Sequence, residues 1–348
     1  MAVRLKQAGV DDFVVLERAG EVGGTWRDNT YPGAACDVPS HLYSFSFAPN
    51  PDWTRSFSPQ TEIQAYLRRT ATDFGVRPHI RFHHEVVGAA WDETAQRWHV
   101  RTNARGPGGD PQGGEFEADV LVSATGALSD PAIPPLPGLD RFEGTVFHSA
   151  RWDHGHDLTG RRVAVVGTGA SAIQFVPMVQ PHVAQLTVFQ RTPPWILPRW
   201  DRRFHPAERW AFRHLPPLQR LARAGIYWGR EQTVAGFVVA PNLMRAAERL
   251  AHRHLERSVP DPLLRAKLTP DYRIGCKRIL ISNDYLPALT RPNVDLVPAG
   301  VSEVRAGSVV ASDGTEHEVD TIIFGTGFHV TDIPVADRIV GRGGVALK

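Results

Sequence analysis

The chain has 348 residues, of which 42% are hydrophobic and 22% charged, and its formal net charge is +2. This length is enough for about two domains, and the small net charge argues against a nucleic acid or another polyanion as partner. The mean hydropathy of −0.25 and the absence of a long apolar run predict no membrane span.

Cysteine and histidine usage narrows the class of protein further. The two cysteines, Cys36 and Cys276, are too far apart in sequence for a redox pair and indicate no disulfide framework. The 15 histidines show neither an H-E-x-x-H pattern nor Cys/His ligand spacing, so no metal site is expected. Residues 1–12 lack the apolar core of a signal peptide. Together these features predict a cytoplasmic protein.

The first predicted elements belong to an α/β unit. Residues 3–9 are typical of the last turns of a helix that a glycine closes. Residues 13–17 are apolar on both faces and predict a buried parallel strand. Residues 61–74, with Thr61 at the start and Glu62 in the first turn, predict a helix.

The next segment is predicted to be β-rich. Residues 85–102 favour a hairpin with an Asp-Glu-Thr turn, and the Gly- and Pro-rich residues 105–114 predict an irregular excursion. A further strand is expected at 118–123. Residues 131–138, which read PAIPPLPG, predict a stiff linker between domains.

Beyond the linker a second alternation of strands and helices begins. Strands are predicted at 162–166 and 186–189, and strand character returns at 294–297 and 320–324. Residues 202–257 have helical spacing and few β-formers. The alternation predicts a second parallel α/β unit with a helical insertion.

A glycine loop in this second unit points to a dinucleotide. The strand at 162–166 runs into G-x-G-x-x-A, which opens a helix, and this context makes the pattern a credible phosphate-binding turn. Gly167 permits the tight turn, Gly169 allows close approach of the pyrophosphate, and the helix N-terminus faces the phosphates. The predicted contact residues are Gly167, Thr168, Gly169, Ala170 and Ser171.

The residues after the next strand indicate which dinucleotide binds. An NAD site usually has Asp or Glu there to hold the ribose hydroxyls. This chain has Arg191 and Thr192 instead, and a guanidinium can form a bidentate, charge-assisted hydrogen bond with a 2′-phosphate. We therefore expect NADPH.

A first nucleotide site is predicted from Glu17, which ends a strand as the ribose-binding acid of such sites does. That acid lies about 20 residues beyond the glycine fingerprint, and counting back from Glu17 passes Met1. We therefore expect the chain to begin inside the crossover helix of a βαβ unit, through a truncation or a mis-assigned start codon.

Two further segments flank that first site. Glu21–Arg27 contains Gly23, Gly24, Thr25 and Trp26, with glycines where a backbone must come close to a ligand. Tyr31–Asp37 follows as Tyr-Pro-Gly-Ala-Ala-Cys-Asp. Residues Phe142–Asp153 then fit F-x-G-x-x-x-H-x-x-x-W-[P/D], spacing included.

The stretch Phe142–Asp153 resembles the signature of the Baeyer–Villiger branch of the class B flavin-dependent monooxygenases. The G-G-x-W and Y-P-G-A-x-C-D segments also resemble this family, and the resemblance runs in order through nearly the whole chain. Relatives that oxidise nitrogen or sulfur usually have Tyr or Phe where Trp152 stands. His148 is either a group that fixes domain orientation or a structural histidine.

The resemblance implies an FAD site. It assigns to FAD contacts Glu17, Gly23, Gly24, Thr25, Trp26, Asp37, Tyr43 and Gly126. It also implies that Asp37 lies near the flavin ring and orients a catalytic arginine.

That arginine is implied to be Arg278, at the Lys-Arg pair that precedes a predicted strand. By the same match Lys277 reaches the NADP phosphate or ribose. The resemblance implies that Arg278 lies over the flavin, where a fixed guanidinium can stabilise an anionic C4a-peroxyflavin and then the oxyanion of the substrate adduct.

The fold implied is α/β, with two Rossmann-like dinucleotide-binding domains. The FAD-binding domain is expected at 1–138 and 295–348, without its first strand and Gly-rich loop. The NADP-binding domain is expected at 139–294, with a helical insertion at about 202–270. The family has a further C-terminal stretch after the position of Lys348.

The implied reaction is NADPH-dependent insertion of one oxygen atom of O₂ into a ketone, giving an ester or lactone. One alternative is an N- or S-oxygenating flavin monooxygenase, and another is an inactive NADP-binding fragment. A disulfide reductase of the same plan lacks support because no C-x-x-C is present.

The arginine-rich residues 202–257 allow two interpretations. A basic amphipathic helix can dock on an anionic membrane, but such a face is more often solvated, and membrane contact is disfavoured. The apolar side chains of this segment are expected to form its buried side: Trp210, Phe212, Leu215, Leu218, Leu221 and Tyr227.

Overall fold

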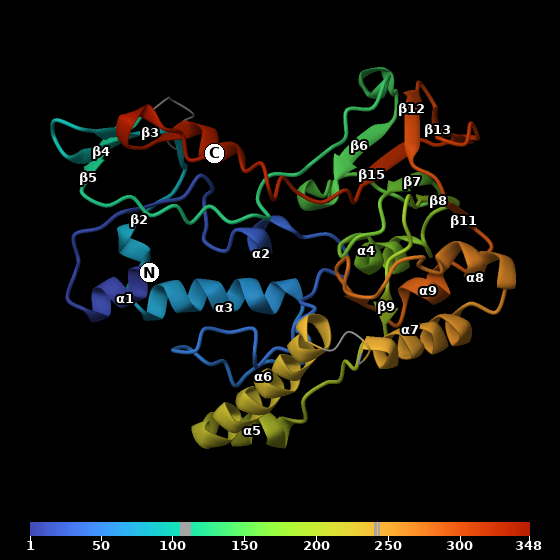
Figure 1. Cartoon of the computed structure of the whole chain (residues 1–348), viewed down its shortest axis with the longest axis horizontal. Coiled ribbons are helices and arrows are strands. Elements are labelled where there is room, and N and C mark those ends of the chain that lie inside the picture. The colour runs from blue at the N-terminus through green and yellow to red at the C-terminus, as the bar shows by residue number, and fades with distance from the viewer. Residues whose placement is uncertain (105–112, 240–241, 243) are drawn as a thin grey trace. The chain divides into compact units, whose positions relative to one another are not determined.

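The computed structural model describes residues 1–104, 113–239, 242 and 244–348, which form two compact units. Unit 1 comprises residues 1–28, 63–132 and 328–348, and unit 2 comprises residues 29–62 and 133–327. Each unit combines helices and strands in a mixed α/β fold (Figure 1). Residues 29–62 and 295–327 thus group with unit 2, whereas the sequence had assigned them to the FAD-binding domain.

Unit 1 is built on a four-stranded sheet of order β16-β3-β4-β5. The hairpin predicted at 85–102 is confirmed, because β3 and β4 pair antiparallel and turn at Asp92, whose carboxylate accepts from the backbone N–H of Thr94 and Ala95. The elements of unit 1 are α1 (Ala2–Gln7), β1 (Val15–Leu16), α2 (Thr25–Asp28), α3 (Gln60–Asp73, from Ile63 on), β2 (Ile80–Arg81), β3 (His84–Asp92), β4 (Arg97–Ala104), β5 (Gly114–Ala118) and β16 (Ile339–Val340).

The helices and the first strand predicted in this unit are confirmed. The strand predicted at 13–17 is reduced to β1, which pairs in parallel with β2. α3 starts one residue before its predicted start. Gly9 follows α1 with φ +77°, the left-handed conformation expected of a glycine that closes a helix. The irregular excursion predicted at 105–114 falls mostly on residues that are not described.

The strand predicted at 118–123 is wrong. β5 ends at Ala118, and the residues after it have no regular structure. Val120 and Val122 are 74% and 52% exposed, although their apolar character predicted burial. A parallel strand is stable only with hydrogen-bonded neighbours, and no described residue pairs with this segment.

Unit 2 is built on a five-stranded, all-parallel sheet of order β11-β8-β7-β15-β6. The strands predicted at 162–166, 186–189, 294–297 and 320–324 are all confirmed within one residue. The elements of unit 2 are β6 (Thr145–His148), β7 (Arg162–Val166), α4 (Ala172–Val179), β8 (Gln185–Phe189), β9 (Ile196–Leu197), α5 (Pro206–His214), α6 (Pro216–Val238), α7 (Met244–Ser258), α8 (Pro262–Leu268), β10 (Leu280–Ile281), α9 (Tyr285–Ala288), β11 (Val294–Val297), β12 (Val301–Arg305), β13 (Ser308–Ala311), β14 (Glu316–Glu318) and β15 (Thr321–Phe324).

Both faces of this sheet are covered, which explains its apolar strands. Val163 and Val165 of β7 pack on a core that includes Phe175 of α4 and residues of α7, α8 and α9. Ala164 and Val166 point to the opposite face, against the small antiparallel sheet β12-β13-β14. Alternate residues of one strand therefore enter two different cores. This arrangement leaves the ends of the strands for function.

The predicted helical insertion is confirmed as α5, α6 and α7, but its predicted buried side is wrong. Only Phe212 of that set is buried, at 7% exposure. The others are exposed: Trp210 59%, Leu215 53%, Leu218 42%, Leu221 69% and Tyr227 45%. α6 instead turns Gln219 and Arg223 toward the loop that follows Asp37, because these two side chains hydrogen-bond it.

Candidate functional site

The carboxyl edge of the parallel sheet carries the predicted phosphate-binding loop. Gly167 follows β7 with φ +106°, and a Cβ there would lie 2.6 Å from the carbonyl oxygen of Gly325, which follows β15. Only glycine fits such a backbone at so close an approach. The loop Gly167–Ser171 leads directly into α4, as the sequence predicted.

No side chain caps the start of α4, where the N–H groups of Ile173 and Gln174 donate to the backbone carbonyls of Gly169 and Ser171. Ser171 stands at the N-cap but makes no capping side-chain hydrogen bond. Thr168 and Ala170 lie in the same loop, before the first turn of the helix. A helix N-terminus whose N–H groups are not capped by its own side chains attracts an anion.

The structure brings Arg191 to the same edge as the glycine loop. β8 neighbours β7 in register, with Phe189 opposite Val166, so that Arg191 and Thr192 leave the sheet beside Gly167. Arg191 is exposed. The geometry thus assembles a glycine turn, a helix N-terminus and an exposed guanidinium on adjacent strands.

A second group of predicted residues meets elsewhere in unit 2. Arg278 Nη2 donates to Asp37 Oδ2, in an ion pair between residues 241 apart in sequence. The Arg278 side chain is 61% exposed and that of Asp37 is 25% exposed. The guanidinium therefore keeps donors available to a ligand while the carboxylate fixes its orientation.

The residues before Asp37 are clamped by α4. Gln174 Oε1 accepts from the Ala35 N–H at 3.2 Å and from the Tyr31 hydroxyl at 3.1 Å, and its Nε2 donates to the Ala35 carbonyl at 3.0 Å. Gly33 has φ +81°, and a Cβ there would lie 2.7 Å from the Gln174 carbonyl oxygen. These contacts fix the backbone two residues before Asp37.

We expect the substitution Gln174→Leu to lower the free energy of unfolding by about 1–3 kcal/mol, because the backbone groups of Ala35 and the Tyr31 hydroxyl lose their partner. Urea denaturation followed by tryptophan fluorescence measures this change. Gln232→Leu, at an exposed position of α6, is the matched control and should change little. Equal stability of both variants would contradict the clamp.

The residues after Asp37 are held by α6, which the sequence did not reveal. Arg223 Nη1 donates to the carbonyl oxygens of His41 and Leu42, both at 2.9 Å, and of Ser44 at 3.1 Å. Gln219 Nε2 donates to the Asn50 carbonyl at 2.8 Å. An arginine within an arginine-rich helix gives no sequence signal of such a contact.

Two further predicted residues, Lys277 and Tyr43, also belong to unit 2, as does Cys36. Lys277 precedes Arg278, and its Nζ stands 4.9 Å from the centre of the Tyr272 ring. Cys36 precedes Asp37 and is buried, and burial raises the pKa of its thiol to about 12. The Cys36 thiol is therefore protonated at neutral pH and is no nucleophile. Tyr43 is 38% exposed.

Unit 1 holds the remaining predicted FAD contacts. Glu17 follows β1, and its carboxylate accepts from the Ala19 N–H at 2.8 Å and pairs with Arg27 at 3.1 Å. Gly23 and Gly24 have φ +121° and +50° and lead into α2, where Thr25 and Trp26 lie. A Cβ on Gly24 would meet nothing within 4 Å, so the backbone there is open to a ligand.

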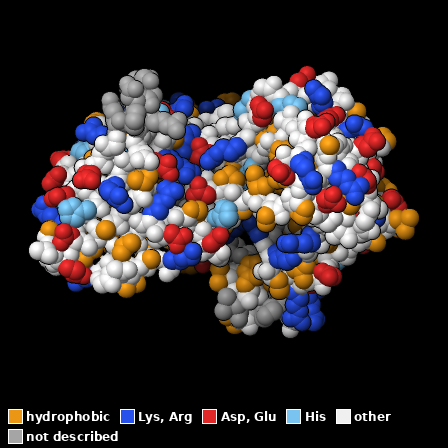
Figure 2. Space-filling model, turned by 90° about the horizontal axis from the view of Figure 1, so that it is seen from above, with side chains coloured by type: hydrophobic (Ala, Val, Ile, Leu, Met, Phe, Trp, Pro, Cys, Tyr) orange, Lys and Arg blue, Asp and Glu red, His pale blue; other side chains and the backbone are white. Residues whose placement is uncertain are grey.

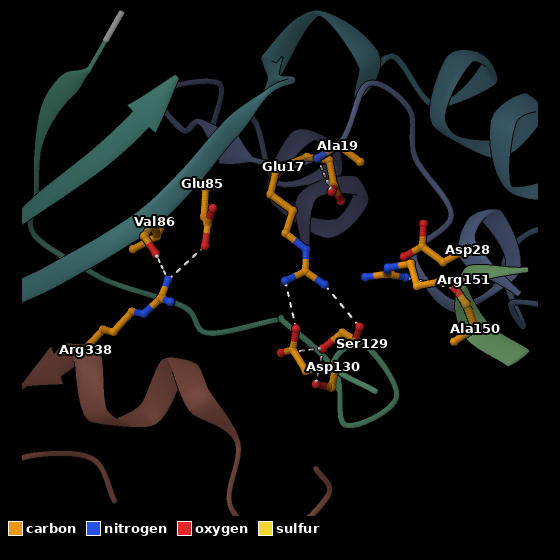
Figure 3. Close-up of polar contacts among 12 residues, drawn as sticks. Glu17, Ala19, Asp28, Glu85, Val86, Ser129, Asp130, Ala150, Arg151 and Arg338 are labelled. Atoms are coloured by element: carbon orange, nitrogen blue, oxygen red, sulfur yellow. Dashed lines mark hydrogen bonds and ion pairs between the residues drawn. The ribbon is translucent and has the colours of Figure 1, made fainter. Parts of the chain in front are cut away.

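Two of these segments are joined within unit 1. Arg18, next to Glu17, donates to Asp130 at 2.9 Å and to the Ser129 carbonyl at 3.1 Å, shortly after Gly126 (Figure 3). Gly126 has φ +74° with open space around its Cα. The acid and the glycine that the sequence assigned to one cofactor therefore lie on segments that contact each other.

The segment Phe142–Asp153 has a structural explanation for most of its fixed residues. A Cβ on Gly144 would lie 2.3 Å from the Asp320 carbonyl oxygen. Trp152 packs on Phe147 and Phe175, with ring centroids 5.1 and 5.3 Å apart. His148, at the end of β6, is 2% exposed and accepts from the Ala150 N–H at 3.0 Å.

Acidic and basic side chains are interspersed over the face drawn in Figure 2. Among the residues that the structure describes, no group of three His, Cys, Asp or Glu side chains could hold a metal ion. Within the same residues, no helix is both long and apolar enough to cross a membrane.

Comparison with known proteins identifies the relatives of this chain. Residues 9–218 match the family model described as flavin-binding monooxygenase-like. A protein of Streptomyces coelicolor named Baeyer–Villiger monooxygenase is 59% identical over 99% of this chain, and one of Pseudomonas aeruginosa with the same name is 50% identical over 99%. The chain spans 65% and 64% of the length of these two relatives.

Solved structures agree with these matches. A polycyclic ketone monooxygenase from Thermothelomyces thermophila superposes with a TM-score of 0.86 at 28% identity, over 99% of this chain and 65% of that one. An oxidised steroid monooxygenase bound to NADP superposes with a TM-score of 0.81 at 33% identity, over 99% and 72% of the two chains.

Proposed function

Because this chain belongs to the flavin-binding monooxygenase-like family, we propose that it acts as an FAD- and NADPH-dependent monooxygenase that converts a ketone to an ester or lactone. The observation that carries the proposal is the Asp37–Arg278 ion pair, at the two positions that the family resemblance had assigned to catalysis. Two relatives that are 59% and 50% identical carry the name Baeyer–Villiger monooxygenase.

The NADPH site that we propose is the carboxyl edge of the parallel sheet in unit 2, within a Rossmann-like domain. The close approach at Gly167 and the uncapped start of α4 fit a pyrophosphate. Arg191 would bind the 2′-phosphate, Thr192 would assist it, and Lys277 would reach the phosphate or ribose. The similarity to a steroid monooxygenase that is bound to NADP supports this assignment.

The FAD site that we propose draws on a second Rossmann-like domain. The left-handed backbone and open space at Gly24 and Gly126 fit the close passage of a ligand. Glu17 would bind the adenosine ribose, and its ion pair with Arg27 orients the carboxylate for that contact. Gly23, Thr25 and Trp26 would complete the contacts that unit 1 makes.

Bound FAD would supply the redox chemistry of the proposed reaction, with NADPH as the reductant and O₂ as the source of the oxygen atom. The chain supplies electrostatics and orientation. The exposed donors of Arg278 would stabilise the negative charge that develops on the carbonyl oxygen of the ketone. Asp37 would hold the guanidinium in place, and the Gln174 and Arg223 contacts would hold the loop that carries Asp37.

The proposal is tested by purifying the protein and measuring its flavin absorbance, NADPH oxidation and product. We expect a yellow protein that consumes NADPH and O₂ when a ketone is added and releases an ester or lactone, identified by mass spectrometry. A colourless protein that still binds NADPH would instead support the inactive NADP-binding fragment.

We expect Arg191→Ala to raise the KM for NADPH by about 10- to 100-fold and to leave the KM for NADH nearly unchanged, because the lost contact is a charge-assisted bond to the 2′-phosphate. Steady-state kinetics with both dinucleotides measures the two values. Arg161→Ala, at an exposed position before β7, is the matched control. A parallel rise in both KM values would contradict the assignment of Arg191 to the 2′-phosphate.

A further inference from the structure

Arg199 contacts the residue before Asp37, and no sequence pattern marks it. It follows β9, two residues after Leu197, and β9 pairs in parallel with β10. Asn283 fixes its backbone, because the Arg199 N–H donates to Asn283 Oδ1 at 2.9 Å and Asn283 Nδ2 donates to the Arg199 carbonyl at 2.7 Å. The start of this side chain is therefore rigidly placed.

Arg199 is half-buried, its Nε atom is inaccessible, and its guanidinium has few partners. Its Nη2 donates to the Cys36 carbonyl at 3.4 Å, and its Nε has no hydrogen-bond partner among the described residues. The group lies over the Phe57 ring, 5.1 Å from its centre. A buried cation without its full set of hydrogen bonds is costly, unless a ligand supplies them.

The carboxylate nearest in sequence, Asp201, is already engaged. Its Oδ2 pairs with Arg55 at 2.7 Å, and its Oδ1 accepts from the Ser56 hydroxyl at 3.1 Å and from the Phe57 N–H at 3.3 Å. Burial lowers the pKa of Arg199, while Asp201 acts in the opposite direction. Asp201 therefore forms its ion pair with Arg55 and not with Arg199.

Arg199 and Arg278 act on consecutive residues. Arg199 contacts the carbonyl of Cys36, and Arg278 pairs with the carboxylate of Asp37. The two guanidinium groups therefore reach neighbouring residues of one loop, Arg199 through a main-chain carbonyl and Arg278 through a carboxylate. A guanidinium held at a fixed position, with donors that its own chain does not fully use, is a group that binds a carboxylate or phosphate.

We propose that Arg199 binds an oxyanion of the molecule that occupies the Asp37–Arg278 site. The oxyanion is either the carboxylate of the substrate, which would make the enzyme selective for ketones that carry an acid group, or a phosphate of the dinucleotide. The substrate assignment rests on the proposed function, whereas the anion site itself does not. Phe57 supports the flat face of the guanidinium and leaves its edge for the ligand.

The test is equilibrium binding, which needs no turnover. Isothermal titration calorimetry compares 4-oxopentanoate, its methyl ester and NADP⁺ on the unchanged protein, Arg199→Met, Arg199→Lys and the control Arg220→Met, an exposed arginine of α6. If the substrate supplies the oxyanion, Arg199→Met should lower the affinity for 4-oxopentanoate by about 10- to 100-fold. The affinities for the methyl ester and for NADP⁺ should not change. Arg199→Lys should recover part of that loss.

The other outcomes distinguish the two possible sources of the oxyanion and show which proposal has failed. If Arg199→Met lowers the affinity for NADP⁺ alone, the oxyanion belongs to the dinucleotide. Equal affinity of the unchanged protein and Arg199→Met for all three molecules, including no measurable binding of any, overturns the proposal. The last outcome is that the unchanged protein fails to oxidise NADPH with a ketone while Arg199→Met still loses affinity for one anion only. That result would refute the proposed function and support the anion site.

Discussion

Replacing Arg278 by alanine is expected to lower the rate of ester or lactone formation by about 10²- to 10³-fold or more, while NADPH still reduces the bound flavin at its normal rate. The reason is that the guanidinium acts on charge that develops only when the ketone reacts. Asp37 holds that guanidinium, which is otherwise 61% exposed. Stopped-flow absorbance measures flavin reduction, and chromatography of the products measures oxygen insertion.

Two further variants sharpen this test. Arg278→Lys keeps the charge but loses the forked donors, so it should fall between the alanine variant and the unchanged protein. Arg291→Ala, at an exposed position after α9, is the control and should keep full activity. Ester formation at the normal rate by the alanine variant would refute the role of Arg278.

Acid should destabilise unit 2 through two buried histidines. Burial lowers the pKa of His41 from its ordinary value of 6.5 to about 4, and it lowers the pKa of His148 equally to about 4. Both side chains are nearly inaccessible, at 4% and 2% exposure. Each shift corresponds to at most roughly 3 kcal/mol of stability.

The direction follows from the protonation of the two states. Above pH 6.5 both histidines are neutral in the folded and in the unfolded chain. Their contribution to the free energy of unfolding is then at its full value. As the pH falls from 6.5 toward 4, the unfolded chain binds protons that the folded chain does not, and this stability is lost. The free energy of unfolding should therefore be several kcal/mol lower at pH 4.5 than at pH 7.5.

Urea denaturation at a series of pH values measures the effect. His41→Asn should reduce the loss between pH 7.5 and 4.5 by about 2–3 kcal/mol, because one buried group no longer titrates. His182→Asn, at an exposed position, should leave the pH profile unchanged. A profile that is equally steep in the unchanged protein and in His41→Asn would contradict this account.

Much of unit 2 could be predicted because its sequence signals are local. An apolar run followed by glycines and a helix has few other folded states, and the strands at β7, β8, β11 and β15 appear within one residue of their predicted bounds. The ranges that fail depend on neighbours. Residues 118–123 have the composition of a buried strand but no described partner, and of the apolar side chains predicted to be buried at 210–227 all but Phe212 are exposed.

The residues of the candidate site also differ in whether a local sequence pattern reveals them. Gly167 and Arg191 could be assigned from the chain itself, because a strand, a glycine turn and a helix N-terminus place them at one edge of the sheet. Asp37 and Arg278 came from the family resemblance, since no rule of spacing joins residues 241 apart. Gln174 and Arg223 gave no signal, because an amide and an arginine on amphipathic helices are usually solvated.

The sequence by itself determined the family, the parallel α/β plan of unit 2, and the residue types of its glycine loop and its Lys-Arg pair. These follow from local spacing and from backbone conformations that few residues adopt. Only the tertiary structure decided which distant side chains meet. The pairing of Asp37 with Arg278, the clamps on the loop of Asp37, and the incompletely satisfied guanidinium of Arg199 depend on burial and on long-range contacts, which no local pattern specifies.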